Sequence, residues 1–290
     1  MNYRHAFHAG NFADVMKHAV LALIITHLKA KPKPFRVIDT HAGIGIYDLA
    51  SDEAARTGEW RDGIARLMAA AAADQLGAMA PSLAPYVAAV EALQVGAELK
   101  RYPGSPALAR ALLRQDDRLI ANELHAEDSA ALRRNLGRDS RLKVLSHDGW
   151  SVLKSTLPPK ERRGVVLIDP PFEQPGEFDR MVKALVDGAR RFATGIYVLW
   201  YPLKDERAVA CFKRDLGETG LARLLAAELS VRPPGVGAAA GKVLFGSGLI
   251  IHNPPYGLYE ALEVVLPGLA RLLACDGAGA SQLTVLRGED

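Results

Sequence analysis

The stretch that decides the fold reads Phe35-Arg36-Val37-Ile38-Asp39-Thr40-His41-Ala42-Gly43-Ile44-Gly45. Residues 35–39 form a short apolar run that ends in an acid, and the glycines behind it are typical of a loop after a strand. Glycine lets the backbone approach a ligand closely. The loop has one glycine fewer than the G-x-G-x-x-G pattern of dinucleotide-binding proteins, so a purely structural turn explains it as well.

Further apolar runs with the length of a strand follow this stretch, and helical patterns separate most of them. They cover residues 119–122, 143–146, 165–168, 195–200, 244–251 and 282–286. On the amino-terminal side, Asn11 can cap a helix over residues 12–30, because its side-chain oxygen can accept an early backbone N–H. The alternation predicts an α/β fold in which a mainly parallel seven-stranded sheet has helices on both faces.

One connection in this pattern is too long for a simple crossover between neighbouring strands. Residues 46–118 include an alanine-rich stretch over 68–73 and helical patterns on either side of Pro81 and Pro85. We therefore expect residues 1–290 to form a single domain that carries a small helical insertion over residues 51–100.

The composition excludes several classes of protein. Cys211 and Cys275 lie far apart, which argues against a disulfide framework or a thiolate zinc site. His5, His8 and His18 have no thiolate or tight acidic cluster beside them, so no metal is expected. The chain starts without an apolar signal segment, and no apolar run approaches the roughly 18 residues of a membrane span. We expect a cytoplasmic monomer with no membrane partner.

The net charge of +3 is too small to announce a polyanionic partner by itself. Lysine and arginine are nevertheless in excess over acids in two segments, residues 1–36 and residues 133–163. If both segments lie on one face, they form a surface that attracts phosphates. Ordinary solvated surface charge explains them equally well.

Acidic residues follow successive predicted strands, where an open parallel sheet binds its ligands. Glu123 follows residues 119–122 and suits the hydroxyls of a ribose. Asp148-Gly149 comes after residues 143–146, and its carboxylate can accept a hydrogen bond from an adenine amine. The series ends with Asp169-Pro170-Pro171-Phe172 after residues 165–168. A nicotinamide enzyme shares the glycine loop and Glu123 but has no use for this last motif.

The chemistry of Asp169-Pro170-Pro171-Phe172 indicates methyl transfer to an adenine amine. Such an amine is a poor nucleophile because its lone pair is delocalised into the ring. The Asp169 carboxylate and the Pro170 carbonyl can accept both of its N–H bonds, so that the lone pair faces the methyl donor. Phe172 offers a face on which the base can stack, worth about 1 to 3 kcal/mol. A strand-terminating turn is the structural alternative.

A second motif of the same kind competes for this role. Asn253-Pro254-Pro255-Tyr256 also follows an apolar run and also presents two acceptors. The catalytic strand should lie beside the strand of the glycine loop, whereas Asn253 follows a strand near the end of the chain. We therefore interpret this second motif as a turn.

Nearly the whole chain resembles the RlmJ family of bacterial 23S ribosomal RNA adenine-N6 methyltransferases, with a looser match over the insertion. The motifs that carry the resemblance include several at the amino terminus that generic methyltransferases lack. They are Tyr3-Arg4-His5, Phe7-His8-Ala9-Gly10-Asn11, Asp14, Lys17-His18, Asp39-Thr40-His41-Ala42-Gly43, Tyr102-Pro103-Gly104-Ser105-Pro106, Glu123-Leu124-His125 and Ala193-Thr194-Gly195-Ile196-Tyr197 with Leu199-Trp200-Tyr201-Pro202. One departure is Phe172, where a tyrosine is common in the family.

The resemblance implies a Rossmann-like fold, S-adenosylmethionine (SAM) as the cofactor, and a set of roles. Asp169 would be catalytic, together with Pro170 and Phe172. Tyr3 would touch the RNA, and we expect His5 and Lys17 to face the substrate as well, the lysine as a phosphate contact. SAM would be bound by His18, His41, Ser105, Glu123, Asp148 and Gly149.

The sequence therefore predicts SAM-dependent methylation of N6 of one adenine in 23S ribosomal RNA. Two alternatives stay open. The same four-residue centre serves DNA adenine-N6 methyltransferases, although this chain has no separate target-recognition domain. A non-catalytic nucleic-acid-binding protein linked to DNA uptake or use is the other alternative, and the intact Asp169 argues against it.

Overall fold

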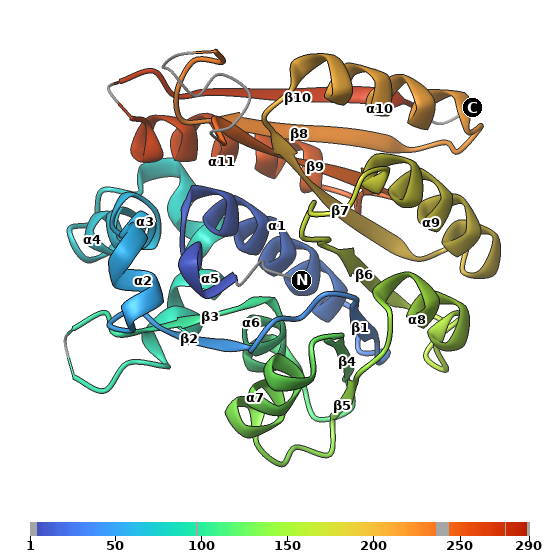
Figure 1. Ribbon diagram of the computed structural model, residues 1–290, viewed down its shortest axis with the longest axis horizontal. Coiled ribbons are helices and arrows are strands. Elements are labelled where there is room, and N and C mark those ends of the chain that lie inside the picture. The colour runs from blue at the N-terminus through green and yellow to red at the C-terminus, as the bar shows by residue number, and fades with distance from the viewer. Residues whose placement is uncertain (1–4, 97, 236–243, 276, 289–290) are drawn as a thin grey trace.

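An eight-stranded sheet crosses the molecule in the computed structural model, which describes residues 5–96, 98–235, 244–275 and 277–288 (Figure 1). Its strand order is β10-β8-β9-β7-β6-β1-β4-β5. The bounds are β1 Arg36–Asp39, β4 Arg118–Asn122, β5 Leu142–Leu145, β6 Gly164–Ile168, β7 Ile196–Leu203, β8 Leu224–Ser230, β9 Gly246–His252 and β10 Ala280–Arg287. A separate pair of strands consists of β2 Ile46–Asp48 and β3 Arg101–Pro103.

The sheet is mainly parallel, which confirms the predicted α/β fold. Strands β5, β4, β1, β6 and β7 run in one direction, whereas β9 runs antiparallel to both of its neighbours, β7 and β8. Strand β10 pairs antiparallel with β8 at the edge. The five parallel strands therefore end together at one edge of the sheet.

The expected number of strands is too low by one, because β8 carries no strand-like pattern in its sequence. Its sequence, Leu-Leu-Ala-Ala-Glu-Leu-Ser, consists mostly of good helix formers. Pairing with β9 on one side and β10 on the other holds it as a strand and buries Leu225, Ala227 and Leu229. Tertiary context overrides local propensity here.

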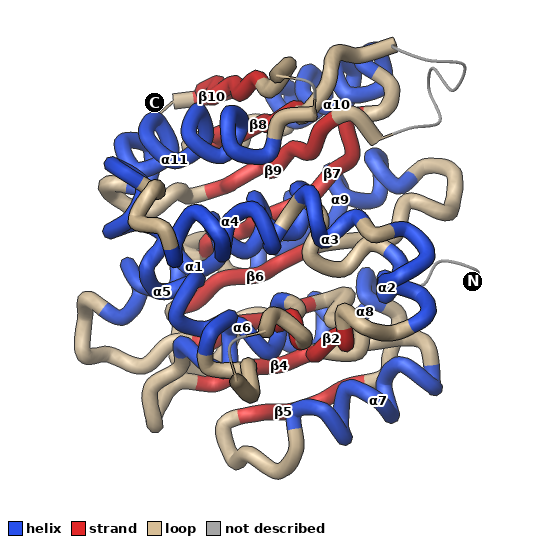
Figure 2. Tube along the Cα trace, turned by 90° about the vertical axis from the view of Figure 1, so that its left-hand side faces the viewer, coloured by secondary structure: helices blue, strands red, loops and turns tan. Residues whose placement is uncertain are grey.

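Helices cover both faces of the sheet (Figure 2). One face carries α1, α6, α7 and α11, and the other carries α8, α9 and α10. Their bounds are α1 Phe12–Lys29, α6 Ser105–Leu112, α7 Ala126–Leu136, α8 Gly149–Thr156, α9 Glu177–Arg191, α10 Glu206–Glu218 and α11 Leu258–Leu273. A short 3-10 helix, η1 His5–Phe7, precedes α1.

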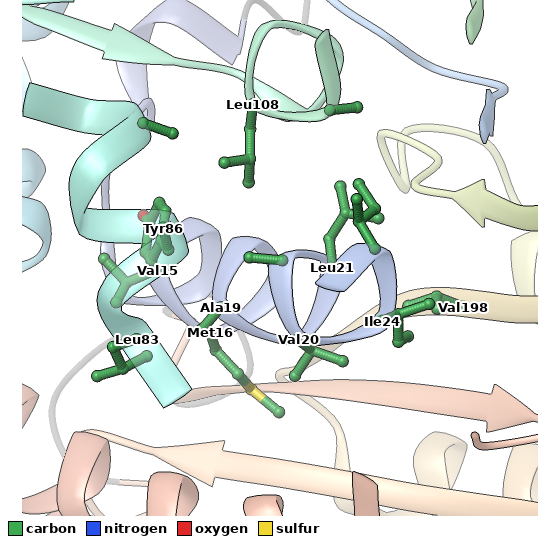
Figure 3. Close-up of a cluster of buried hydrophobic side chains, with 14 of the residues drawn as sticks. Val15, Met16, Ala19, Val20, Leu21, Ile24, Leu83, Tyr86, Leu108 and Val198 are labelled. Atoms are coloured by element: carbon green, nitrogen blue, oxygen red, sulfur yellow. The ribbon is translucent and has the colours of Figure 1, made fainter. Parts of the chain in front are cut away.

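Helix α1 is the centre of the larger core. Asn11 caps it as predicted, with its side-chain oxygen accepting the N–H groups of Ala13 and Asp14 at 3.0 Å. Apolar side chains surround the helix on nearly every side, so it is buried between the sheet and other helices. In Figure 3, Val15, Met16 and Leu21 of α1 lie among side chains from α5, α6 and β7. The buried helix therefore holds the polar side chains of Asp14, Lys17 and His18 in fixed positions.

The helices between β2 and β3 lie within residues 51–100, the segment expected to form an insertion. They are α2 Asp52–Thr57, α3 Glu59–Asp62, α4 Ile64–Ala72, η2 Gly77–Met79 and α5 Ala80–Glu91. Helix α5 contains both Pro81, in its first turn, and Pro85, whereas the sequence pattern indicates helices on either side of them. It packs against α1 and α6, and thus brings this segment next to the amino-terminal half of α1.

Candidate active site

A cavity of about 490 Å³ opens at the carboxyl ends of β1, β4 and β6. Helix α1, the start of α6 and the segment between β2 and β3 close its other side. It brings together residues that lie more than 160 positions apart in the sequence. Those singled out from the sequence that line it are His5, Lys17, His18, His41, Ser105, Glu123, Asp169, Pro170 and Phe172.

Two of the expected site residues that the structure describes, Asp148 and Gly149, do not line the cavity. Asp148 is exposed and caps α8 by accepting the N–H of Ser151 at 2.9 Å. Gly149 lies behind His41, and a side chain there would begin 2.6 Å from the Nε2 atom of that histidine. Gly149 therefore adjoins the cavity through His41, and the charge of Asp148 acts on the same ring. Tyr3 lies outside the described residues.

Lys17 is the residue whose place differs most from the expectation. It is 3% exposed and lies inside the protein, whereas a surface contact to phosphate was expected. Its Nζ atom is 2.8 Å from Asp14 and 2.5 Å from Oδ2 of Asp169. The expected phosphate contact is wrong because Lys17 projects inward from a helix that is buried all round, and its charge is already shared by two acids.

His5 completes this buried ionic cluster. Its Nε2 atom is 2.9 Å from Oδ2 of Asp14, and the same oxygen accepts the N–H of Gly10. Burial alone raises the pKa of Asp14, but the charges of His5 and Lys17 outweigh it and hold that pKa well below its usual value. Burial alone lowers the pKa of Lys17, and the two facing carboxylates raise it above its usual value. Lys17 therefore stays charged beside Asp169.

Asp169-Pro170-Pro171-Phe172 begins directly after β6, at the floor of the cavity. Lys17 occupies Oδ2 of Asp169, and no described residue donates a hydrogen bond to its Oδ1. Phe172 adopts a left-handed φ of +53°, which turns its ring out of the strand direction. The ring meets Trp200 edge to face, with the ring centroids 5.8 Å apart. An acceptor and two aromatic side chains thus lie side by side.

The glycine loop is fastened to the next strand through Glu123. The two oxygens of that carboxylate accept the N–H groups of Gly43 and His125, each at 2.9 Å. Burial raises the pKa of Glu123, and these two hydrogen bonds lower it in part. Gly43 needs to be glycine, because its φ is +59° and a side chain there would strike the hydroxyl of Tyr47. Glu123 therefore shapes the loop as well as lining the cavity.

Asp39 and Ser105 form a second buried pair at the end of β1. The Ser105 hydroxyl donates to Oδ2 of Asp39 at 2.6 Å, and the His41 N–H donates to Oδ1. Burial raises the pKa of Asp39 to about 7, although the hydrogen bond from Ser105 opposes the shift. The sequence pattern assigns Asp39 no role, since its burial beside Ser105 at the start of α6 depends on tertiary contacts.

His18 projects from α1 toward the same cavity and is 1% exposed. Its Nδ1 atom is 2.6 Å from the hydroxyl of Tyr102, whereas its Nε2 atom is buried without a partner in the structure. Burial lowers the pKa of His18 to about 3, so the ring is neutral near pH 7. A buried polar atom without a partner in a cavity wall is suited to a ligand.

The competing motif at Asn253 lies at the opposite edge of the sheet. Strand β9 is antiparallel to β7, so Asn253 comes after the end of β9 and beside the start of β7. Its side-chain amide donates to the carbonyls of Ala193 and Gly195 at 2.8 and 2.9 Å. It therefore ties a turn together, as interpreted from the sequence, and Tyr256 points to solvent.

Two cations at the mouth of the cavity were missed by sequence reasoning. Lys204 follows β7 and Arg232 follows β8, and both line the cavity that Phe172 and Trp200 also line. In the described part of the chain, neither forms an ion pair with an acid, and the Nε atom of Arg232 is buried without a partner. Neither lies in a basic segment of the sequence, so composition gave no signal for them.

The two basic segments of the sequence meet away from this cavity. Arg163, before β6, donates hydrogen bonds to the carbonyls of Leu28 and Lys33, which lie before β1. These positions are at the amino ends of parallel strands, whereas Asp39 and Asp169 are at the carboxyl ends. Part of the predicted basic surface therefore exists, on the edge opposite the cavity.

The described residues contain neither a group of metal-binding side chains nor a membrane-spanning helix. Over residues 5–96, 98–235, 244–275 and 277–288, no three His, Cys, Asp or Glu side chains are grouped so that they could hold a metal ion. His8, one of the histidines considered, is instead 3.0 Å from Glu59. None of the helices described there combines the length and the apolar character that crossing a membrane requires.

Comparison with known proteins gives consistent matches over nearly the full chain. It is 43% identical to ribosomal RNA large subunit methyltransferase J of Escherichia coli (strain K12), over 96% of each chain. The protein of the same name from Haemophilus influenzae is 42% identical over 97% of this chain and 96% of its own. A crystal structure from Legionella pneumophila superposes with a TM-score of 0.85 at 31% identity, covering 96% of this chain and 98% of that one. Residues 32–285 match the family model described as ribosomal RNA large subunit methyltransferase D, RlmJ, and the chain therefore belongs to the RlmJ family of ribosomal RNA methyltransferases.

Proposed function

We propose that this protein transfers a methyl group from SAM to N6 of one adenine in 23S ribosomal RNA. The family supports SAM-dependent methylation of ribosomal RNA, since its members are SAM-dependent methyltransferases of large-subunit ribosomal RNA. The choice of adenine N6 as the methylated atom is supported by the Asp169-Pro170 acceptor pair. This pair lies in the cavity, and Lys17 holds one oxygen of the Asp169 carboxylate.

The residues of the cavity fit SAM. The cofactor supplies an electrophilic methyl group on a positively charged sulfur, and its remaining parts need acceptors and donors. Glu123 can accept from the ribose hydroxyls, and the glycine loop leaves room for close approach of the ligand. His18, Ser105 and His41 would hold the rest, with Asp148 and Gly149 at the adenine end. The unpartnered Nε2 atom of His18 is the specific observation in favour of this fit.

The chain's own part in catalysis is to prepare the nitrogen that is methylated. Because Lys17 occupies Oδ2 of Asp169, the other oxygen is the one that can accept an N6–H, and the Pro170 carbonyl can accept the second. Two acceptors on one amine draw its lone pair out of conjugation and aim it. After transfer the nitrogen carries a positive charge and loses a proton, for which the Asp169 carboxylate is the nearest base. Positioning supplies most of the rate in such a displacement.

The adenine side of the cavity is formed by Phe172 and Trp200. A target base inside an RNA duplex has to leave its stack, and an aromatic face compensates for the lost stacking. We assign phosphate contacts next to the flipped nucleotide to Lys204 and Arg232, which line the same cavity and have no acidic partner among the described residues. Tyr3 and His5 would touch the same nucleotide from the amino-terminal side.

We further propose that residues 1–290 act as a single methyltransferase domain, with residues 51–100 as an insertion in it, and that the protein is a monomer. We also propose that it acts in the cytoplasm, where its proposed substrate is found. The single-domain assignment is supported by the one continuous larger core, which includes side chains of α1, α5 and α11.

The test uses total RNA and genomic DNA from cells that lack this enzyme. The purified protein should transfer labelled methyl from SAM to 23S RNA, and nucleoside analysis should recover the label as N6-methyladenosine. Label in DNA alone would favour the DNA methyltransferase alternative. No transfer to either polymer would contradict the proposal.

A further inference from the structure

Three side chains from three elements form a buried hydrogen-bonded row beside the cavity. The Tyr86 hydroxyl lies 2.8 Å from that of Tyr102, which lies 2.6 Å from Nδ1 of His18. Tyr86 belongs to α5, Tyr102 to β3 and His18 to α1, and all three are at most 1% exposed. Figure 3 shows Tyr86 beside the first turns of α1. The row ends at Nε2 of His18, in the cavity wall.

The ring of His18 is neutral, since burial holds its pKa far below 7. A neutral imidazole carries one proton, on Nδ1 or on Nε2, and the partner of the other nitrogen decides which. If Nε2 carries the proton, the cavity wall presents a donor. If Nδ1 carries it, the wall presents an acceptor that would repel an anionic group.

The hydroxyl protons distinguish the two arrangements. With Tyr86 donating to Tyr102 and Tyr102 donating to Nδ1, each hydroxyl proton has an acceptor and Nε2 carries the ring proton. In the reverse order, Nδ1 donates to Tyr102 and Tyr102 donates to Tyr86. The Tyr86 proton is then left without an acceptor, because no other hydrogen bond of Tyr86 exists among the described residues. In the first order the unpartnered donor is Nε2–H of His18, which lies in the cavity wall, where a ligand can accept it. Tyr86 does not line the cavity, so its unpartnered proton in the reverse order costs about 1 to 3 kcal/mol, and the first order is preferred.

We infer that Tyr102 and Tyr86 set the tautomer of His18, so that it presents a hydrogen-bond donor to the carboxylate of SAM. This inference rests on the proposed cofactor site. The carboxylate is assigned because Glu123 and Asp148 lie toward β4 and β5, on the far side of the glycine loop. His18 instead lies on the side where α6 begins with Ser105, and the amino end of a helix favours an anion.

This inference gives the segment between β2 and β3 an indirect part in cofactor binding, through His18. Tyr86 is carried by that segment, and its hydroxyl strengthens Tyr102 as a donor because linked hydrogen bonds polarise one another. Tyr86 and Tyr102 are positioning residues, since neither lines the cavity.

The first test measures the tautomer itself in the full-length protein without cofactor. Nitrogen-15 NMR of labelled histidine, with His18→Gln to assign the signal, should show a protonated Nε2 and an unprotonated Nδ1. A protonated Nδ1 in the wild type would overturn the inference. Because this experiment requires neither SAM binding nor methyl transfer, its outcome is independent of the proposed function.

The second test compares SAM with 5′-methylthioadenosine, which lacks the amino acid part. Tyr102→Phe should weaken SAM binding about tenfold and Tyr86→Phe about two- to threefold, while both leave methylthioadenosine binding unchanged. Tyr197→Phe is the matched control, because it removes a buried hydroxyl that donates to the Phe192 carbonyl on the other face of the sheet. Equal effects of Tyr102→Phe and Tyr197→Phe would contradict the inference, as would equal weakening of both ligands.

Discussion

The ammonium group of Lys17 lies between two carboxylates, 2.5 Å from Asp169 at the end of β6 and 2.8 Å from Asp14 one turn earlier on α1. The lysine side chain is 4% exposed and the Asp14 side chain 1%. One end of the cluster is thus fixed in the buried helix α1, and the other end is the proposed acceptor of the adenine amine. Lys17 connects the core to the reacting centre.

Replacing Lys17 by methionine should damage both stability and turnover. The change leaves Asp169 without its partner and Asp14 with His5 alone, and breaking a buried ion pair costs about 3 to 5 kcal/mol. We expect the free energy of unfolding to fall by about this amount, kcat to fall at least tenfold, and the Kd for SAM to change less than threefold. Denaturant unfolding, single-turnover methylation and calorimetry measure the three quantities.

Lys29→Met is the control for that experiment, since Lys29 is an exposed lysine at the end of the same helix. It should leave all three quantities nearly unchanged. Wild-type turnover by a folded Lys17→Met protein would show that Lys17 supports the fold only.

Most of the fold could be predicted from sequence, because its signals are local. The cap at Asn11, the apolar run before Asp39 and the loop at Gly43 depend on a few neighbouring residues. Strand β8 could not be predicted, since only pairing with β9 and β10 makes its alanines and Glu228 a strand. Local pattern fails where distant partners decide the structure.

In the candidate site, too, some residues could be predicted from local sequence and others depend on tertiary contacts. The order of acids along the chain indicates Glu123 and Asp169, because the carboxyl ends of parallel strands meet at one edge. The burial of Lys17 and the cavity-facing positions of Lys204 and Arg232 depend on contacts between elements far apart in sequence. A lysine in a helical pattern looks the same whether it meets solvent or a buried carboxylate.

A substitution at Asn253 tests whether the reacting centre is Asp169-Pro170 or Asn253-Pro254. Asn253→Ala removes two hydrogen bonds to the turn before β7, so the free energy of unfolding should fall by about 1 to 2 kcal/mol. Methyl transfer per folded molecule should stay within twofold of the wild type. Loss of transfer with intact folding and SAM binding would move the reacting centre to Asn253.

Lys204 and Arg232 should contribute to RNA affinity through phosphate contacts. Each alanine variant should weaken RNA binding and reduce the slope of log K against log salt by about 0.7, the value for one phosphate of a single strand. SAM affinity should not change. Lys183→Ala, an exposed lysine of α9 on the other face, is the control. An unchanged salt slope in both Lys204→Ala and Arg232→Ala would rule out the assigned phosphate contacts.

His18 should make stability sensitive to acid. Its pKa is about 3 in the folded protein and 6.5 in the unfolded chain, so the unfolded state binds the extra proton as the pH falls below about 6.5. The folded state should therefore lose about 1.4 kcal/mol of stability per pH unit between about 6 and 4 from this residue. His18→Gln should lack this part of the loss. Denaturant unfolding at several pH values measures it, and parallel profiles for both proteins would contradict the buried neutral histidine.

The most direct test of the account is methylation by Asp169→Ala and wild-type protein of 23S RNA that lacks the modification. The account predicts N6-methyladenosine with the wild type, at least a thousandfold lower rate with the variant, and nearly equal SAM affinity for the two. A variant that binds SAM and still methylates N6 at a comparable rate would contradict the assignment of Asp169 as the catalytic acceptor.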